Sequence, residues 1–211
     1  MSTIGKLYTE HHEKNRGTDF SIMKFERSRF FKENIGTGKT VLDIGCRNGA
    51  LTRFFVDNNT VTGVDFDAKA LQAAKDDLKI ETIEMDLLTD WTALDGRTFD
   101  VVVAGEVLEH LYFPEKIVEK VAAHLNEGGM FVGSVPNAFS LKNRLRLLMG
   151  TKKGTSLMDP THINHFTFAE LEKLLSKYFK EVSVKGLGRY TKLSALSPKH
   201  FAFDLVFVCK K

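Results

Sequence analysis

The hydrophobic and polar residues of this chain follow two patterns in turn, one typical of strands and one typical of helices. This alternation begins near residue 40. Segments with the length of buried strands occur at residues 40–45, 60–65, 99–104 and 130–135, and residues 80–85 have the alternating pattern of a further strand. Between them, apolar residues recur at helical spacing at residues 50–56, at 67–78, and from Pro114 to about residue 125. Strands that alternate with helices in this way predict βαβ units, in which right-handed crossovers build a parallel sheet.

Single residues mark where these elements begin and end. Asp67 is a suitable N-cap for the helix at 67–78, because its carboxylate can accept hydrogen bonds from the first N–H groups. Pro114 fits the first position of the next helix, where its missing N–H is not needed. Gly128 and Gly129 are expected to end that helix, and Pro136 to stop the strand that follows.

The C-terminal part of the chain departs from this alternation. A capping box that begins at Thr167 predicts a helix to about residue 179. Two strands, at residues 181–187 and 201–209, follow with no helix predicted between them, and the loop that joins them contains Pro198. Strands connected in this way pair antiparallel.

Together these elements predict one α/β domain over residues 1–211, with a seven-stranded, mostly parallel sheet, a C-terminal antiparallel hairpin and helices on both faces. Residues 1–19 read as a polar arm that folds as a lid over a bound ligand, and residues 20–34 carry an imperfect helical stripe. Residues 137–166 are too long for a tight connection, so we expect them to cap the substrate site.

Composition and charge narrow the class of protein. The chain has 211 residues, 43% hydrophobic and 27% charged, which excludes a disordered chain, a collagen-like fibre and a coiled-coil rod. Cys46 and Cys209 cannot build a disulfide framework or a four-thiolate zinc site, so a reducing, cytoplasmic location is expected. The first twenty residues lack the apolar core of a signal peptide, and no apolar run approaches the ~18 residues of a membrane span.

The charge balance leaves the partners open. A net charge of +3 neither demands nor excludes nucleic acid or an anionic membrane. The sequence contains no pattern that indicates an oligomeric state.

The turn after the strand at 40–45 is the strongest candidate for a ligand site. It lies in Val41-Leu-Asp-Ile-Gly-Cys-Arg-Asn-Gly49, where glycine lets the backbone approach a ligand and helix N–H groups point toward it. Asp65 ends the next strand, where an acidic side chain can accept hydrogen bonds from both hydroxyls of a ribose. The pattern favours nucleoside binding over the simpler interpretation, a tight turn followed by a capping aspartate.

The spacing also indicates which nucleoside binds. A nicotinamide site needs Gly-x-Gly-x-x-Gly, which Gly45 and Gly49 do not match. From about residue 20 to its end the chain instead resembles the class I S-adenosylmethionine-dependent methyltransferases. That family has an Asp/Glu-x-Gly-x-Gly-x-Gly turn, an acidic residue that ends the second strand and an aspartate after the third. The matching positions are Asp43, Gly45, Gly49, Asp65 and Asp86.

The resemblance implies a Rossmann-like fold that ends in a strand hairpin, and S-adenosylmethionine as cofactor. The turn would hold its methionine end, Asp65 its ribose, and Asp86 would lie beside its adenine amine. Arg47 stands where the family usually has glycine, and its side chain would either point away from the cofactor or pair with its carboxylate. The positions assigned to the cofactor are Asp43, Gly45, Cys46, Arg47, Gly49, Asp65, Phe66, Asp86, Leu87 and Glu106.

A second group of candidate residues follows the fourth strand, at the edge of the sheet where ligands bind. If this segment is helical, Glu106, Glu109 and His110 lie on one face. His162 and His165 come just before the last predicted helix. In one interpretation, His110 or His165 is a general base that takes a proton from an acceptor hydroxyl. In the other, Glu106, Glu109, His110 and a later histidine, taken as His165, bind a divalent cation.

The Glu-x-x-Glu-His pattern is similar to that of the ubiquinone-pathway O-methyltransferases. It also resembles the small-RNA terminal 2′-O-methyltransferases, which add a later histidine-rich segment. Many small-molecule methyltransferases contain the same residues as packing and pocket features, so the spacing alone does not decide whether a metal binds.

The predicted cap carries a basic amphipathic pattern at residues 141–149, followed by Lys152 and Lys153. A basic face over the pocket can select an anionic acceptor or a membrane surface. The simpler interpretation is a solvated helix whose leucines pack inward.

The predicted function is methyl transfer from S-adenosylmethionine to a small-molecule acceptor. A hydroxyl oxygen is favoured, because a hydroxyl needs the base or metal that residues 106–110 can supply. One alternative is a metal-dependent RNA terminal 2′-O-methyltransferase, against which the chain has no large basic excess. The other is a non-catalytic S-adenosylmethionine-binding protein, for which Arg47 in the turn is the main argument.

Overall fold

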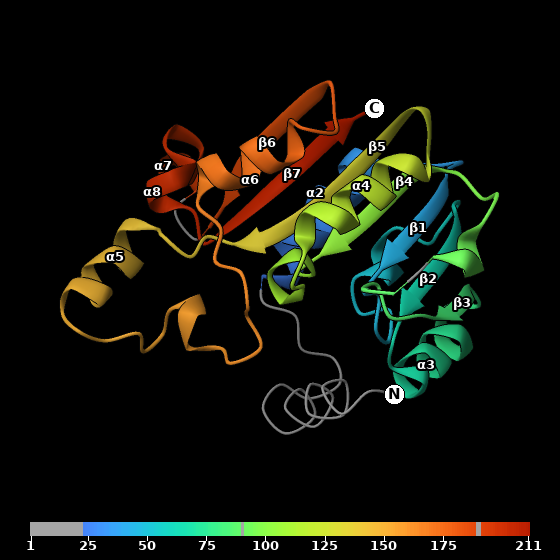
Figure 1. Ribbon diagram of the computed structural model, residues 1–211, viewed down its shortest axis with the longest axis horizontal. Coiled ribbons are helices and arrows are strands. Elements are labelled where there is room, and N and C mark those ends of the chain that lie inside the picture. Colours follow the sequence, from blue (N-terminus) through green and yellow to red (C-terminus); the bar gives the residue numbers. More distant parts are fainter. Residues whose placement is uncertain (1–22, 90, 189–190) are drawn as a thin grey trace.

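The computed structural model describes residues 23–89, 91–188 and 191–211, so the predicted arm at residues 1–19 lies outside the described residues. A seven-stranded sheet with the order β3-β2-β1-β4-β5-β7-β6 forms the centre of the molecule (Figure 1). Strands β1 to β5 pair in parallel, and β7 runs antiparallel to both β5 and β6. The predicted sheet is confirmed. Its strands are β1 (Thr40–Ile44), β2 (Thr60–Asp65), β3 (Glu81–Glu84), β4 (Phe99–Gly105), β5 (Leu125–Pro136), β6 (Glu181–Leu187) and β7 (Asp204–Lys210).

Helices cover both faces of the sheet. Successive side chains of a strand point to opposite faces, so β4 places Val101 and Val103 in one core cluster and Val102 in the other. The first cluster packs against α2 (Lys24–Ile35) and α3 (Ala68–Leu78). The second packs against α4 (Pro114–Ala123) and α6 (Phe168–Leu175). The apolar stripes read from the sequence therefore pack on the sheet as predicted.

The predicted helix caps are present. The side chain of Asp67 accepts hydrogen bonds from the backbone N–H groups of Lys69 and Ala70, which caps α3. Thr167 and Glu170 form the reciprocal capping box of α6. Pro114 stands at the start of α4.

The helix predicted at residues 50–56 is only a single 3-10 turn, Thr52–Phe54. The hydroxyl of Thr52 donates a hydrogen bond to Asp43, which ties this segment to β1. Asn58 then turns the chain with a φ of 64°, and β2 begins at Thr60. One turn of helix is all that fits between these two constraints.

The loop predicted between the last two strands contains two short helices, α7 (Thr191–Leu196) and α8 (Pro198–Phe201). Pro198 begins α8 rather than interrupting the chain, because proline is well tolerated in the first turn of a helix. The prediction of no helix here was wrong. β7 consequently begins three residues later than predicted, at Asp204.

β5 begins at Leu125, earlier than the predicted start at residue 130. Gly128 and Gly129 therefore lie inside the strand and do not end α4, which stops at Ala123. The pairing register between β4 and β5 shifts at this point, between Phe99 and Val101. Such a bulge is a common place for glycine within a strand.

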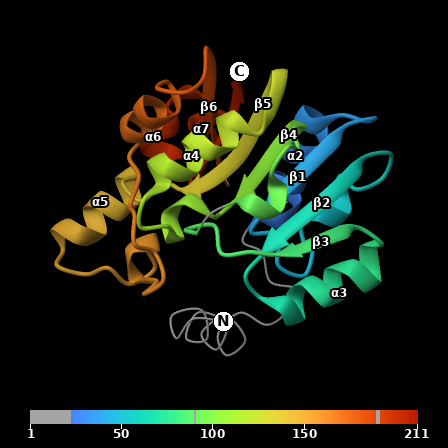
Figure 2. The same ribbon diagram turned by 45° about the vertical axis from the view of Figure 1, so that its right-hand side comes forward.

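The predicted cap, residues 137–166, contains α5 (Leu141–Leu148) and the 3-10 helix η4 (Ser156–Met158). Figures 1 and 2 both place α5 at the end of the molecule opposite α3. The leucines of α5 do not pack inward, because Leu145 is 52% and Leu148 is 85% exposed. Among the helices of the described residues, none combines the length and apolar content needed to cross a bilayer.

Candidate functional site

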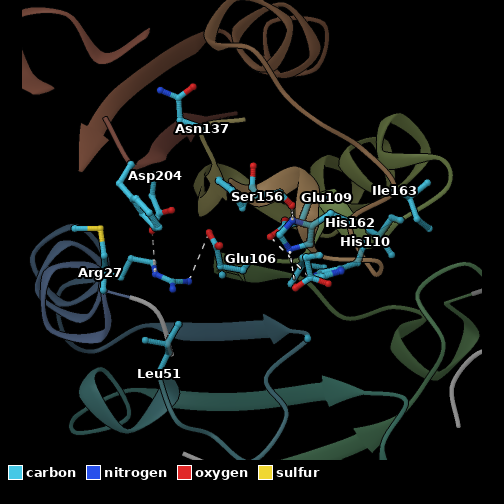
Figure 3. Close-up of a pocket in the computed structure, with 18 of the residues that line it drawn as sticks. Arg27, Leu51, Glu106, Glu109, His110, Asn137, Ser156, His162, Ile163 and Asp204 are labelled. Carbon is cyan, nitrogen blue, oxygen red and sulfur yellow. Dashed lines mark hydrogen bonds and ion pairs between the residues drawn. The ribbon is translucent and has the colours of Figure 1, made fainter. Parts of the chain in front are cut away.

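A cavity of about 1990 Å³ opens at the carboxyl ends of the strands. Its walls come from the turn after β1, the ends of β2, β4 and β5, and the cap. This is the edge where ligands of open α/β sheets bind. Figure 3 shows six of the charged and imidazole residues of this cavity in two groups: Arg27 with Glu106 and Asp204, and His110 with Glu109 and His162.

The two glycines of the turn after β1 have different roles. Gly45 has a φ of 72° and lines the cavity, and a Cβ atom there would lie 2.6 Å from a methyl carbon of Val107. Gly49 has a φ of 75° and faces Leu78 of α3, where a side chain would clash. Gly49 is absent from the described cavity wall, and its position against Leu78 shows a packing role, in which it lets α3 approach closely.

Arg47 takes the left-handed conformation that its glycine counterpart would adopt easily, with a φ of 48°. Its backbone N–H donates a hydrogen bond of 3.0 Å to the carboxylate of Asp65. The turn therefore keeps its shape although the usual glycine is missing. The side chain of Arg47 lines the cavity and does not close it.

Asp65 is held rigidly at the end of β2. Its two carboxylate oxygens accept hydrogen bonds from the backbone N–H groups of Arg47 and Asp67, at 3.0 Å and 2.9 Å. Burial raises its pKa, and these two hydrogen bonds oppose that shift. Such bonds orient a carboxylate toward the cavity that it lines.

The other residues assigned to the cofactor also line this cavity, apart from Gly49. Cys46 and Leu87 are buried, and Phe66 is half-buried. Asp86 is exposed, and its side chain accepts a hydrogen bond from the N–H of Leu88 in a local turn. The sequence assignment thus gathers residues from the ends of four strands, β1 to β4, into one wall.

Asp43 is a buried acid beneath this wall. The pKa of Asp43 is raised from 3.8 to about 7, chiefly by burial, while the Thr52 hydroxyl opposes the shift and Asp65 adds to it. The folded chain therefore keeps a proton that the unfolded chain loses between pH 3.8 and about 7. The free energy of unfolding of the ligand-free protein should fall as the pH rises through that interval.

Asp43→Asn should remove this dependence, because the amide oxygen can still accept the Thr52 hydrogen bond but carries no charge. Between pH 5 and pH 8, the melting temperature of the variant should gain about 5 °C relative to that of the unmodified chain. Differential scanning calorimetry of both proteins measures this. If the difference in melting temperature between the two proteins stays constant from pH 5 to pH 8, the pKa of Asp43 is not raised.

The segment after β4 is not the helix that would place Glu106, Glu109 and His110 on one face. Glu106 has a φ of 61°, and only Leu108–His110 form a 3-10 turn. Glu106 therefore points away from the other two candidates: its carboxylate accepts a hydrogen bond of 2.9 Å from Ser134 and lies 3.5 Å from the guanidinium of Arg27. The condition under which Glu106, Glu109 and His110 would share one face is therefore not met.

Arg27 and Asp204 are site residues that the sequence prediction missed. Arg27, on α2, is 2% exposed, and its guanidinium lies between Glu106 and Asp204 (Figure 3). Asp204 begins β7, 3.7 Å from Arg27, and burial raises its pKa well above the usual value. A signal was available for Arg27, which falls in the same stripe of α2 as Phe30 and Phe31.

His110, His162 and Glu109 form the second group. The two imidazole rings have centroids 4.8 Å apart, and Nε2 of His110 lies 3.9 Å from a carboxylate oxygen of Glu109. Each ring places Nδ1 at hydrogen-bond distance from a carbonyl oxygen, of Thr161 for His110 and of Ser156 for His162. Because a carbonyl can only accept, each Nδ1 donates, and Nε2 is the basic nitrogen of the neutral ring.

Backbone hydrogen bonds fix which later histidine joins this group. The N–H groups of Ile163 and Asn164 both donate to the carbonyl of Glu109, at 2.8 Å and 2.9 Å. They place His162 beside His110, while His165 is not on the described cavity wall. Burial and Lys152 lower the pKa of His165. The structure therefore brings His162, and not His165, into this group, and the predicted roles of His165 as a base or metal ligand gain no support from its position.

Glu109 is the most unusual acid of the site. It is 1% exposed, and neither carboxylate oxygen has a hydrogen-bond partner within the described structure. Burial raises its pKa well above the ordinary value, and the nearby Glu106 raises it further. A buried acid left unsatisfied in this way is costly unless a ligand or ion completes it.

The fold and the site together define an α/β protein with a nucleoside-binding wall and an imidazole–carboxylate group beside it. Residues 17–178 match the family model described as a methyltransferase domain. The chain therefore belongs to this methyltransferase family, and it is an S-adenosylmethionine-dependent enzyme with a Rossmann-like fold.

Curated relatives include ubiquinone biosynthesis O-methyltransferases. The protein from Vibrio parahaemolyticus is 29% identical over 160 residues, which cover 71% of this chain and 67% of the relative. The protein from Actinobacillus pleuropneumoniae is 32% identical over 125 residues, covering 54% of this chain and 53% of the relative. The matched region thus spans between half and two thirds of these relatives.

Solved structures show the same fold at low identity. A S-adenosylmethionine-dependent methyltransferase from Archaeoglobus fulgidus has a TM-score of 0.69 and 19% identity, covering 97% of this chain and 99% of that one. The N-methyltransferase NodS from Bradyrhizobium japonicum, in complex with S-adenosylhomocysteine, has a TM-score of 0.62 and 16% identity. The match covers 95% of this chain and 90% of that one.

The residues present fit S-adenosylmethionine. Its ribose needs an oriented acceptor, and Asp65 is a carboxylate held by two backbone N–H groups. Its methionine end carries a carboxylate and an ammonium group, and the cavity offers the buried cation Arg27 beside the acids Glu106 and Asp204. Donors and acceptors of the required charge are thus present among the cavity-lining residues.

Proposed function

We propose that this enzyme methylates a hydroxyl oxygen of a small-molecule acceptor and that His110 removes the proton. The observation that carries the proposal is the orientation of the His110 ring. Its Nδ1–H donates to the carbonyl of Thr161 at 2.9 Å, so the basic nitrogen of the neutral ring is Nε2, in a cavity-lining residue. An imidazole held in one tautomer suits a general base near neutral pH.

The proposed cofactor contacts follow the wall described above. Asp65 holds the ribose hydroxyls, Asp86 and Phe66 lie at the adenine end, and Arg27 binds the methionine carboxylate. S-adenosylmethionine supplies an electrophilic methyl group when it is bound. The chain orients the acceptor in the cavity, and Nε2 of His110 accepts the proton that the hydroxyl loses. Glu109 lies 3.9 Å from this nitrogen, and its raised pKa keeps its carboxyl group neutral beside the neutral ring.

The family and the curated relatives support a small-molecule enzyme over the two alternatives, an RNA terminal methyltransferase and a non-catalytic binding protein. The O-methyltransferase relatives also support oxygen as the acceptor atom. The solved N-methyltransferase shares only the fold and carries no argument about the atom.

A divalent cation is the second candidate for activating the hydroxyl. Glu109, His110 and His162 each offer one ligand atom, and these atoms lie within 4.8 Å of one another. The two Nδ1–H groups donate to carbonyl oxygens, as the second nitrogen of a metal-bound histidine usually does. A cation there would also satisfy the unpaired oxygens of Glu109. This set replaces the predicted one of Glu106, Glu109, His110 and His165.

An acceptor panel tests the proposed reaction. We would incubate the enzyme with S-adenosylmethionine carrying a labelled methyl group and an ortho-diphenol, a monophenol or a primary amine, each with EDTA, Mg²⁺ or Mn²⁺. The expected product is an O-methyl ether that forms in the presence of EDTA. Labelling of the amine alone would contradict the proposal, and labelling of the diphenol only with added cation would favour the metal over the free base.

Metal binding is measured separately by calorimetric titration with Mn²⁺ and Zn²⁺. If the second candidate is right, binding is lost in His162→Ala and kept in His165→Ala. The second variant is a matched control, because it removes the neighbouring imidazole that is not on the cavity wall.

A further inference from the structure

Two segments at one end of the molecule contain no acidic residue. The chain has 27 aspartate and glutamate residues, and none of them lies in residues 137–158 or 191–203. The basic residues of these segments are Lys142, Arg144, Arg146, Lys152, Lys153, Lys192 and Lys199. The chain as a whole is nearly balanced at +3, so this clustering of charge is local.

The same two segments expose most of the large apolar side chains on the described surface. Leu148 is 85% exposed, Leu196 is 80% exposed and Met149 is 72% exposed. Ten of the fifteen exposed large apolar residues lie here, and they are Leu141, Leu145, Leu147, Leu148, Met149, Met158, Leu193, Leu196, Phe201 and Phe203. A concentration of this kind marks an interaction surface, whereas scattered single residues do not.

The segments adjoin one another in space. α5 contacts α8, and α8 contacts α7. Figure 1 shows these three helices at the end of the molecule away from β3 and α3. We call the surface that they form with η4 the apolar-basic end. It continues into the cavity, because Leu145, Met149 and Phe201 are also cavity-lining residues.

We propose that the apolar-basic end docks on an anionic lipid bilayer. Exposed leucine, methionine and phenylalanine side chains between lysines and arginines are the chemistry of an interfacial segment. The apolar groups enter the boundary between headgroups and acyl chains, while the cations bind anionic headgroups. Leu148 on α5 and Leu196 on α7 are the most exposed apolar residues of this surface, and they are the anchors.

The charge of this surface also argues against a second copy of the chain as the occupant. A two-fold contact through this surface would place lysines and arginines of two copies against one another, with no acid in either segment to neutralise them. A bilayer that contains anionic lipid supplies the opposite charge over the whole surface. Docking there also places the mouth of the cavity close to the lipid headgroups.

Vesicle co-sedimentation of the full chain tests the proposal. The vesicles are pure phosphatidylcholine or phosphatidylcholine with a quarter of phosphatidylglycerol, without cofactor or acceptor, so the result does not depend on the proposed reaction. We expect at least tenfold tighter binding to the anionic vesicles. This preference should decrease as salt is raised.

Three variants locate the contact. Leu148→Glu and Leu196→Glu, neither of which lines the cavity, should each weaken vesicle binding at least tenfold. Phe25→Glu is the matched control, because Phe25 is an equally exposed apolar residue at 79%, on α2 outside the two segments. It should bind as the unmodified chain does. Circular dichroism confirms that all three variants fold.

Any of three results would overturn the proposal. The first is the absence of binding to anionic vesicles. The second is equal loss of binding in Phe25→Glu and Leu148→Glu. The third is a dimer in sedimentation equilibrium that Leu148→Glu converts to a monomer, which would make this surface an interface between copies.

Discussion

His110→Ala is expected to lower kcat by about 10²- to 10⁴-fold, which is the usual contribution of a positioned general base. The variant removes the one ring nitrogen to which the proposed mechanism assigns the proton. Affinity for S-adenosylmethionine should change little, because the residues proposed to bind it lie on the turns after β1, β2 and β3 and around Arg27. Initial rates on the methylated member of the acceptor panel, together with calorimetric titration of the cofactor, separate the two effects.

His165→Ala is the control for this experiment. His165 lies three residues beyond His162 but not on the described cavity wall, so kcat should stay within about twofold of the unmodified value. The pH profile provides a second measurement, because the loss of rate on the acidic side should disappear in His110→Ala. Comparable losses in both variants, or a nearly unchanged rate in His110→Ala, would rule out His110 as the base.

Asp65→Ala is expected to weaken S-adenosylmethionine binding by about 10²- to 10⁴-fold. The proposed contact is a pair of hydrogen bonds from ribose hydroxyls to a carboxylate, and each such bond is worth about 1.5–3 kcal/mol. The two backbone N–H groups that hold Asp65 in place make its orientation independent of the cofactor. Calorimetric titration with S-adenosylmethionine and with S-adenosylhomocysteine measures the loss.

Two further variants control for damage to the fold. Asp65→Asn retains an oxygen that can accept from Arg47 or Asp67, so it should unfold near the unmodified temperature and still bind the cofactor weakly. Asp86→Ala removes an exposed carboxylate of the same wall and should lower the affinity for S-adenosylmethionine much less than Asp65→Ala does. Unchanged affinity in a folded Asp65→Ala protein would mean that another residue holds the ribose.

Most of the sheet could be predicted from the sequence. The run at residues 60–65 coincides with β2, and the run at 99–104 differs from β4 by one residue. These strands are largely buried, so β-branched and apolar residues dominate each run, and this pattern is local. The helix predicted at residues 50–56 is only the 3-10 turn Thr52–Phe54, and the helices α7 and α8 were missed; all three elements are short. In short segments, tertiary contacts outweigh local propensity.

The nucleoside-binding wall could also be predicted, for a related reason. Asp43, Gly45 and Asp65 occupy the ends of strands whose positions the apolar pattern fixes. Once the strands are placed, the edge on which these residues lie follows from parallel pairing. Gly49 is the exception, because its contact is with Leu78 of α3, and a spacing rule does not distinguish helix packing from ligand contact.

The sequence by itself determined the class of fold, the family and the wall for the cofactor, because these depend on periodicity and on motifs within single strand–turn units. Only the tertiary structure decided that Arg27 and Asp204 join the site and that His162 rather than His165 lies beside His110. Those choices depend on contacts between distant segments, such as the hydrogen bonds from Ile163 and Asn164 to Glu109. A shift of one residue in these hydrogen bonds would move His162 away from His110. No local sequence pattern determines which residues form them.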